Sequence, residues 1–199
     1  MSFSTSAFAF VVSLVAVING LGIVRLLSGF ADYLRRRRSL QVRHFWVYYV
    51  QTTFQLLVHV LLWWSILSLR EAGNLNFLTY LYLLLGPTLL FLSTSLLLPD
   101  ADGKEVDLRS EYLGFRKVYY SIISAFWLWV VFVWPVFVGA FAPTAKFFVI
   151  YLAISLLQRF SDNLRLHGVM VVANCILFAA FIGLYAMQLG GVGRVISQG

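Results

Sequence analysis

Long apolar stretches alternate with short polar segments along the whole chain. A helix needs about 20 mostly apolar residues to cross the hydrocarbon core of a bilayer. Six stretches reach or approach that length, at about 7–29, 45–68, 77–98, 118–141, 147–160 and 168–189. The fifth stretch is the shortest, and we expect its helix to continue to Leu164. The pattern predicts an all-α, polytopic integral membrane protein with six transmembrane helices.

The six stretches are expected to form three helical hairpins in a single transmembrane domain that covers residues 1–199. The hairpins cover about 7–68, 77–141 and 147–189. The string Phe-x-Asp-x-Leu-Arg occurs around Asp32 and again around Asp162, each time at the end of an odd-numbered helix. Parallel repeats of this kind are a known architecture of membrane proteins. We interpret the hairpins as such a repeat, with Asp32 and Asp162 at equivalent positions.

The composition excludes several classes of protein. Hydrophobic residues make up 61% of the chain, and charged residues make up only 12%, about half of their share in an ordinary soluble domain. This balance excludes a soluble enzyme, a disordered tail and a collagen-like fibre. The single cysteine, Cys175, lies within an apolar stretch, so the chain can form neither an intramolecular disulfide nor a cysteine metal cluster.

The distribution of charge predicts an orientation in the membrane. The formal net charge is +7, and most basic residues lie between the first and second, third and fourth, and fifth and sixth apolar stretches. The positive-inside rule therefore places these connections in the cytoplasm and both termini on the non-cytoplasmic side. Because the chain has no N-glycosylation sequon, we expect a bacterial inner membrane. We expect the first basic cluster to contact anionic lipid headgroups; it consists of Arg35, Arg36, Arg37 and Arg38.

The second apolar stretch carries several polar side chains that share one face. They recur mainly in steps of three and four residues, which is the spacing of neighbours on a helix: Tyr48, Gln51, Thr52, Gln55 and His59. Polar residues at membrane depth usually face a protein interior or a water-filled cavity. This face therefore predicts a path for a small solute or ion, as in a channel or carrier. The alternative is that the face holds helices together in a structural or accessory subunit of a larger membrane complex.

A second candidate site lies at the predicted cytoplasmic ends of the first and fifth helices. Arg25 and Asp32 share a face of the first helix, because seven residues make about two turns. Arg159 and Asp162 lie at the end of the fifth helix. These four residues are expected to form either an ion-paired network or two separate, solvated helix ends.

No set of residues indicates catalysis. The sequence offers no Ser–His–Asp, Cys–His or paired-carboxylate set at one depth, and His59 has no histidine partner at its own depth that could complete a haem site. We therefore expect a non-enzymatic protein without a metal or cofactor. The expected partners are membrane lipids and either further copies of the chain or other membrane subunits, with no role for nucleic acid.

Overall fold

The computed structural model describes residues 5–36, 41–66, 69, 76–97 and 105–187. This part of the chain is almost entirely helical, which confirms the all-α class. Its α-helices are α1 (Thr5–Arg36), α2 (Trp46–Ile66), α3 (Phe77–Leu97), α4 (Leu108–Val138), α5 (Ala145–Phe160) and α6 (Leu164–Phe181). One π-helical turn, η2 (Ile182–Ala186), extends α6, and two short strands, β1 (Gln41–Arg43) and β2 (Glu105–Asp107), precede α2 and α4.

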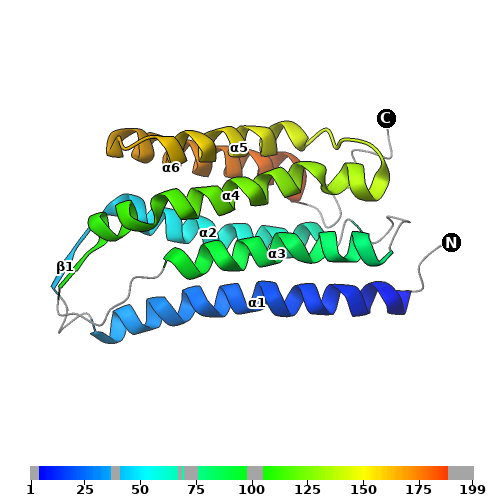
Figure 1. Cartoon of the computed structure of the whole chain (residues 1–199), viewed down its shortest axis with the longest axis horizontal. Coiled ribbons are helices and arrows are strands. Elements are labelled where there is room, and N and C mark those ends of the chain that lie inside the picture. The colour runs from blue at the N-terminus through cyan, green and yellow to red at the C-terminus, as the bar shows by residue number, and fades with distance from the viewer. Residues whose placement is uncertain (1–4, 37–40, 67–68, 70–75, 98–104, 188–199) are drawn as a thin grey trace.

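The helices lie side by side in one elongated bundle (Figure 1). Successive helices run in alternate directions, so the two strands and the starts of α2, α4 and α6 lie together at one end, here called the strand end. The start of α1 and the end of η2 lie at the opposite, terminal end. α3 and α4 lie between α1 and α5, while α2 contacts α1, α3, α4 and α6. The side chains of α2 are therefore within reach of four other helices.

The connections after α1 and after α3 pair as a parallel two-stranded sheet, which the apolar pattern does not predict. The register pairs Gln41 with Glu105, Val42 with Val106 and Arg43 with Asp107. Both segments leave an odd-numbered helix and enter an even-numbered one, so they run in the same direction and pair in parallel. Strands of three residues are too short for the alternating pattern by which a sequence indicates a strand.

α4 begins well before the expected start at residue 118. Its first residue is Leu108, directly after Asp107. The Asp107 carboxylate accepts hydrogen bonds from the backbone N–H groups of Arg109 (3.0 Å) and Ser110 (3.4 Å). Such a cap satisfies the free donors of the first turn, so the helix can begin on a polar segment. A search for apolar length alone overlooks this start.

α5 is shorter than expected. It ends at Phe160 rather than at Leu164, and Ser161 has an extended backbone. The Asn163 side chain accepts hydrogen bonds from the first backbone N–H groups of α6, so Leu164 begins the next helix instead. A second capping residue thus sets the boundary between the last two helices.

The helices have the lengths and composition of a membrane protein. Within the described residues, four helical segments are long and apolar enough to cross a bilayer: Val12–Arg35, Phe77–Leu97, Leu108–Val138 and Leu164–Ala186. α2 has 21 residues and carries the polar face, and it is not among these four segments. α5 has 16 residues, which span about 24 Å at 1.5 Å per residue.

The bundle is apolar on its surface and contains polar groups in its interior. Large apolar side chains are exposed along the helices, among them Val24 and Ile176. Amide and imidazole groups are buried instead, among them Asn19, Gln55 and His59. This distribution is expected of a protein whose surface faces lipid and whose polar groups must find partners inside.

α3 and α4 pack closely where Gly86 faces the indole of Trp129. A Cβ atom at position 86 would lie 2.4 Å from the indole ring. Trp129 Nε1 donates to the Tyr82 carbonyl (2.7 Å), and the Tyr82 hydroxyl donates to the Trp129 carbonyl (3.0 Å). Two reciprocal hydrogen bonds therefore join α3 and α4 beside Gly86, where only glycine leaves room for the indole.

The variant Gly86→Ala should lower the stability of the bundle, because overfilling a packed core costs about 1–3 kcal/mol. Gly114→Ala in α4 is the control, since no heavy atom lies within 4 Å of a Cβ at that position. The control should not lose stability, because alanine favours a helix over glycine by about 1 kcal/mol. Thermal unfolding in one detergent, followed by circular dichroism, measures both variants. An unchanged midpoint for Gly86→Ala would contradict the close packing described.

Candidate functional site

The polar side chains of α2 point into the bundle. Gln51, Gln55 and His59 are 3%, 1% and 0% exposed. Tyr48 is also buried, and its hydroxyl donates to a backbone carbonyl at the end of α3. Thr52 is half-buried, and its hydroxyl donates to the Tyr48 carbonyl one turn earlier in the same helix (2.9 Å). Four of these five side chains therefore reach across to α1, α3 or α4, and only Thr52 bonds within α2.

His59 is hydrogen-bonded through both ring nitrogens. Its Nδ1 lies 2.7 Å from Asn19 Oδ1 on α1, and its Nε2 lies 2.8 Å from the Thr94 hydroxyl on α3. Asn19 Nδ2 donates to the His59 carbonyl (3.0 Å), which leaves the Asn19 oxygen to accept from the ring. This pattern fits a neutral imidazole with its proton on Nδ1 and with Thr94 donating to Nε2. Gly22 makes room for the ring, since a Cβ there would lie 2.2 Å from it.

Gln55 connects α2 with both α3 and α4. Its Nε2 donates to the hydroxyls of Ser93 (2.7 Å) and Thr94 (3.1 Å) on α3. Its Oε1 accepts from the Tyr119 hydroxyl on α4 (2.8 Å). Gln51 Nε2 donates in turn to the Tyr119 oxygen (2.7 Å). The Gln55 amide therefore has partners at both its nitrogen and its oxygen, and the Gln51 amide donates to the same tyrosine.

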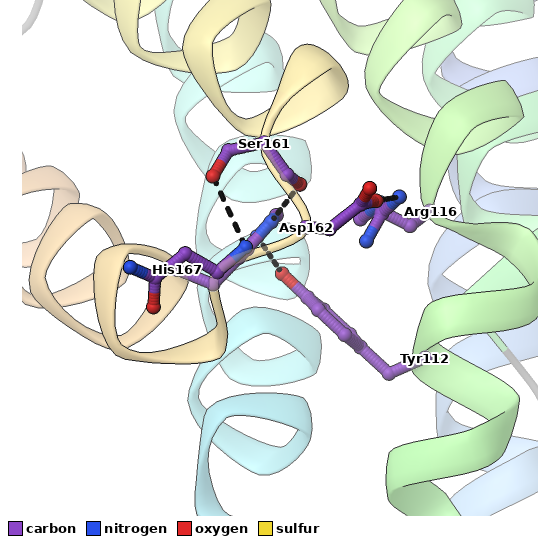
Figure 2. A network of polar contacts seen from close by, with 6 residues as sticks. Tyr112, Arg116, Ser161, Asp162 and His167 are labelled. Atoms are coloured by element: carbon purple, nitrogen blue, oxygen red, sulfur yellow. Dashed lines mark hydrogen bonds and ion pairs between the residues drawn. The ribbon is translucent and has the colours of Figure 1, made fainter.

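The network continues along α4 toward the strand end. The Tyr120 hydroxyl lies 3.4 Å from Gln51 Oε1 and 2.8 Å from the Tyr112 hydroxyl. The Tyr112 hydroxyl lies 2.7 Å from Nδ1 of His167 in α6, and His167 Nε2 donates to the Ser161 carbonyl (3.0 Å), as Figure 2 shows. Because the second bond places the imidazole proton on Nε2, Tyr112 is the donor to Nδ1.

We refer to this continuous set of hydrogen-bonded side chains as the polar seam. It consists of Asn19, His59, Thr94, Gln55, Tyr119, Gln51, Tyr120, Tyr112 and His167. The seam joins α1, α2, α3, α4 and α6 and extends from the middle of the bundle to the strand end. The α2 members of the seam could be predicted from their spacing, whereas their partners lie on otherwise apolar helices and carry no such signal.

An ion pair flanks the polar seam at the strand end. The Arg116 guanidinium on α4 contacts the carboxylate of Asp162, which lies between α5 and α6 (Figure 2). Arg116 is 4% exposed, whereas the Asp162 side chain is largely exposed. The pair therefore connects the interior of the bundle with its surface. Sequence analysis counted Arg116 only as part of the positive charge on this side of the membrane.

The four residues of the predicted charge network do not come together. Asp32 pairs with Arg35 on its own helix (2.6 Å). Arg159 donates to a serine hydroxyl on α4 (2.7 Å), and Arg25 is exposed and has no ion pair within the described residues. The physical reason is that Asp32 lies inside α1, which continues beyond it, whereas Asp162 lies after the end of α5. The two carboxylates therefore have different neighbours.

The basic cluster expected at lipid headgroups is described only in part. Arg35 is exposed and pairs with Asp32, and Arg36 is the last residue of α1. Arg37 and Arg38 lie outside the described residues.

Cavities lie at both ends of α2. Toward the terminal end, an apolar cavity of about 70 Å³ lies between α2, α4 and α5, with Trp127 and Trp129 in its wall. At the strand end, an open groove of about 890 Å³ lies among the starts of α2, α4 and α6. Between them, beside Gln51 and Gln55, lies a cavity of about 10 Å³, which is roughly the space needed for one water molecule.

The chemistry of the seam suits the binding of helices to one another. Within the described residues, no group of three or more His, Cys, Asp or Glu side chains could hold a metal ion. Most amides, hydroxyls and imidazoles of the seam are already engaged with each other, and such hydrogen bonds between helices make a packed core more rigid and specific.

Comparisons with known proteins return no relative. No protein family, no curated protein and no solved structure matches the chain. Its function is therefore inferred from its own residues and their contacts.

The variant Thr94→Val should destabilise the bundle, because the Thr94 hydroxyl contacts both His59 and Gln55. Valine is similar in size, so the loss should come from buried polar groups left without a partner, at about 1–3 kcal/mol. Thr88→Val is a matched control on the same helix, since the Thr88 hydroxyl donates to the Leu84 carbonyl one turn earlier (2.8 Å). Thermal unfolding in detergent compares the two variants. Equal losses would show that the seam is not the cause.

Proposed function

We propose that the chain is a six-span integral membrane protein of three hairpins, in which α2 and α5 cross the bilayer beside the four longer apolar helices. The alternate directions of successive helices support this placement (Figure 1). α5 presents Val149 and Leu157 on its surface, as a lipid-facing helix does. Its ends carry Lys146 and Arg159, whose long side chains can reach the headgroups from a short helix.

The function that the geometry supports best is that of a non-catalytic subunit, structural or accessory, of a larger membrane complex. One observation carries this proposal: Gln55 and His59 each have both ends of the polar group hydrogen-bonded to other helices of the same chain, and the Gln51 amide donates to Tyr119 on α4. A solute path needs polar groups that are free to replace the hydration shell of the solute. Polar groups that are already bonded across helices instead support the role of helix-packing contact.

A channel or carrier for a small solute or ion is the second candidate. It is favoured by the cavities at the two ends of α2, because alternating access requires a closed barrier between two openings. In this candidate the polar seam is the barrier, and its hydrogen bonds break on one side at a time.

In both candidates the strand end faces the cytoplasm. It carries exposed basic residues on several elements, among them Arg43, Arg109, Lys117 and Arg165, and positive charge favours the cytoplasmic side. Membrane lipids surround the bundle, further copies of the chain or other membrane subunits complete the assembly, and a bacterial inner membrane is the proposed location.

A reporter that is active only in the cytoplasm tests this topology. Fused after Gly199 of the full chain, it should give no signal, because the end of η2 lies at the terminal end. Fused after Asp107, before α4, it should give a strong signal. The reverse pattern would contradict the proposed orientation, and a strong signal at both positions would contradict the six spans.

The variant His59→Leu separates the two candidates. If the seam only packs helices, the variant should lower the thermal unfolding midpoint, and neither it nor the original protein should raise the permeability of liposomes. If the seam is a barrier in a path, the original protein should carry flux and the variant should lose it. Proton flux is measured with an enclosed pH-sensitive dye and small-solute flux by osmotic swelling. Val60→Leu, on the exposed side of α2, is the control and should change neither property.

A further inference from the structure

The open groove at the strand end combines charged and apolar surfaces. It has a volume of about 890 Å³ and lies among the starts of the three even-numbered helices. Its basic residues are Arg43 in β1, Arg109 in the first turn of α4 and Arg165 in the first turn of α6. Its apolar residues include Trp46 and Val169. Because the three arginines belong to three different elements, the groove exists only in the folded bundle.

Among the described residues, no carboxylate forms an ion pair with any of these three guanidinium groups. Within the described part of the chain, the ion pairs are Asp32–Arg35 and Arg116–Asp162, and neither includes a residue of the groove. Asp107 also lines the groove, but its carboxylate is engaged in capping α4. The starts of three helices add the positive ends of their dipoles. Three positive charges against one negative charge therefore favour an anion in this groove.

The apolar part of the groove extends from the charges along the helices. Trp46, Val169 and Val172 are 53%, 63% and 45% exposed. Arg165, Val169 and Val172 follow each other in steps of four and three, so they share one face of α6, with the arginine nearest the strand end. At Gly168 the Trp46 indole lies directly on α6, since a Cβ there would be 2.9 Å from the ring. The groove is therefore charged at its outer end and apolar farther along the bundle.

We propose that this groove binds one molecule of an anionic phospholipid. The phosphate lies against Arg43, Arg109 and Arg165, and one acyl chain lies along Trp46 and the two valines of α6. Basic pockets between helices on the cytoplasmic side are typical binding places for anionic headgroups. The apolar wall distinguishes this ligand from a soluble phosphate, which would leave that wall uncovered. The proposal rests on the membrane placement proposed above.

This site differs from the basic cluster that the sequence indicated. Arg35 of that cluster lies at the exposed end of one helix, and its charge is shared with Asp32. The groove instead brings together arginines that are far apart in the sequence and that have no ion pair within the described residues. A count of charge along the sequence would not group these arginines.

Native mass spectrometry of the full chain in detergent tests the proposal. The protein is titrated with phosphatidylglycerol and, separately, with phosphatidylcholine of the same acyl chains. One molecule of phosphatidylglycerol should bind at least about tenfold more tightly than phosphatidylcholine. The variant Arg43→Gln/Arg109→Gln/Arg165→Gln should lose this preference.

A matched variant controls for total charge. Arg25→Gln/Lys117→Gln/Lys146→Gln removes the same charge from exposed positions outside the groove and should keep the preference. The arginines of the groove are also exposed, so both variants should unfold at the temperature of the original protein. If the groove variant does not fold, Arg165→Gln alone replaces it and should weaken binding several-fold.

Three results would overturn the proposal. The third of them would do so without contradicting the membrane placement. Equal losses in the two triple variants would show a general attraction to positive charge. Tight binding of glycerol 3-phosphate that the groove variant abolishes would show a site for a soluble phosphate. A protein that stays in the membrane after alkaline extraction but does not distinguish the two lipids would contradict the groove alone. Release by alkaline extraction would contradict the membrane placement itself.

Discussion

A polar group inside a bundle with an apolar surface is cut off from bulk water, so its hydrogen-bond partners come mainly from other helices. This constraint applies most strongly to α2, which carries Gln51, Gln55 and His59 on the side that meets α1, α3 and α4. Their bonds to Asn19, Thr94 and Tyr119 set the relative depth of these four helices. Sliding one helix past another by a turn would move the partners apart by about 5.4 Å and leave several groups unpaired at once. The close contact of Gly22 with the imidazole follows from the same requirement.

The polar face of α2 could be predicted from the sequence because its spacing is a property of a single helix. Its partners could not, because pairing depends on where each neighbouring helix begins and how it is rotated. Tyr119 lies at the same depth in the bundle as Gln55 because α4 starts at Leu108. That start depends on the cap by Asp107 rather than on the length of the apolar stretch. Thr94 is similar, since the run Ser93-Thr94-Ser95 in an apolar helix gives no sign that two side chains of α2 will reach its middle residue.

The partners of charged residues were harder to predict than the positions of apolar helices, for a related reason. Asp32 and Asp162 occur in the same short string, yet one lies within a helix and the other between two helices, so they pair with different arginines. The apolar pattern located the helices, because a long apolar stretch is a property of each helix by itself. An ion pair forms only if two charged side chains come within a few ångströms of each other. At a helix end, capping by residues such as Asn163 decides the path of the backbone and so where these side chains lie. The repeated string therefore did not indicate which residues contact each other at the two helix ends.

The distribution of partners around His59 also has a consequence for biosynthesis. As the chain emerges from the ribosome, α1 and its Asn19 are complete before α2, so one ring nitrogen can be satisfied at once. Thr94 and Tyr119 are synthesised later, on α3 and α4, so the other ring nitrogen and the amide of Gln55 must wait for them. In the membrane placement proposed above, α1 and α2 alone would thus carry unpaired amides into the bilayer. Stable integration of these two helices should therefore depend on the later synthesis of α3 and α4.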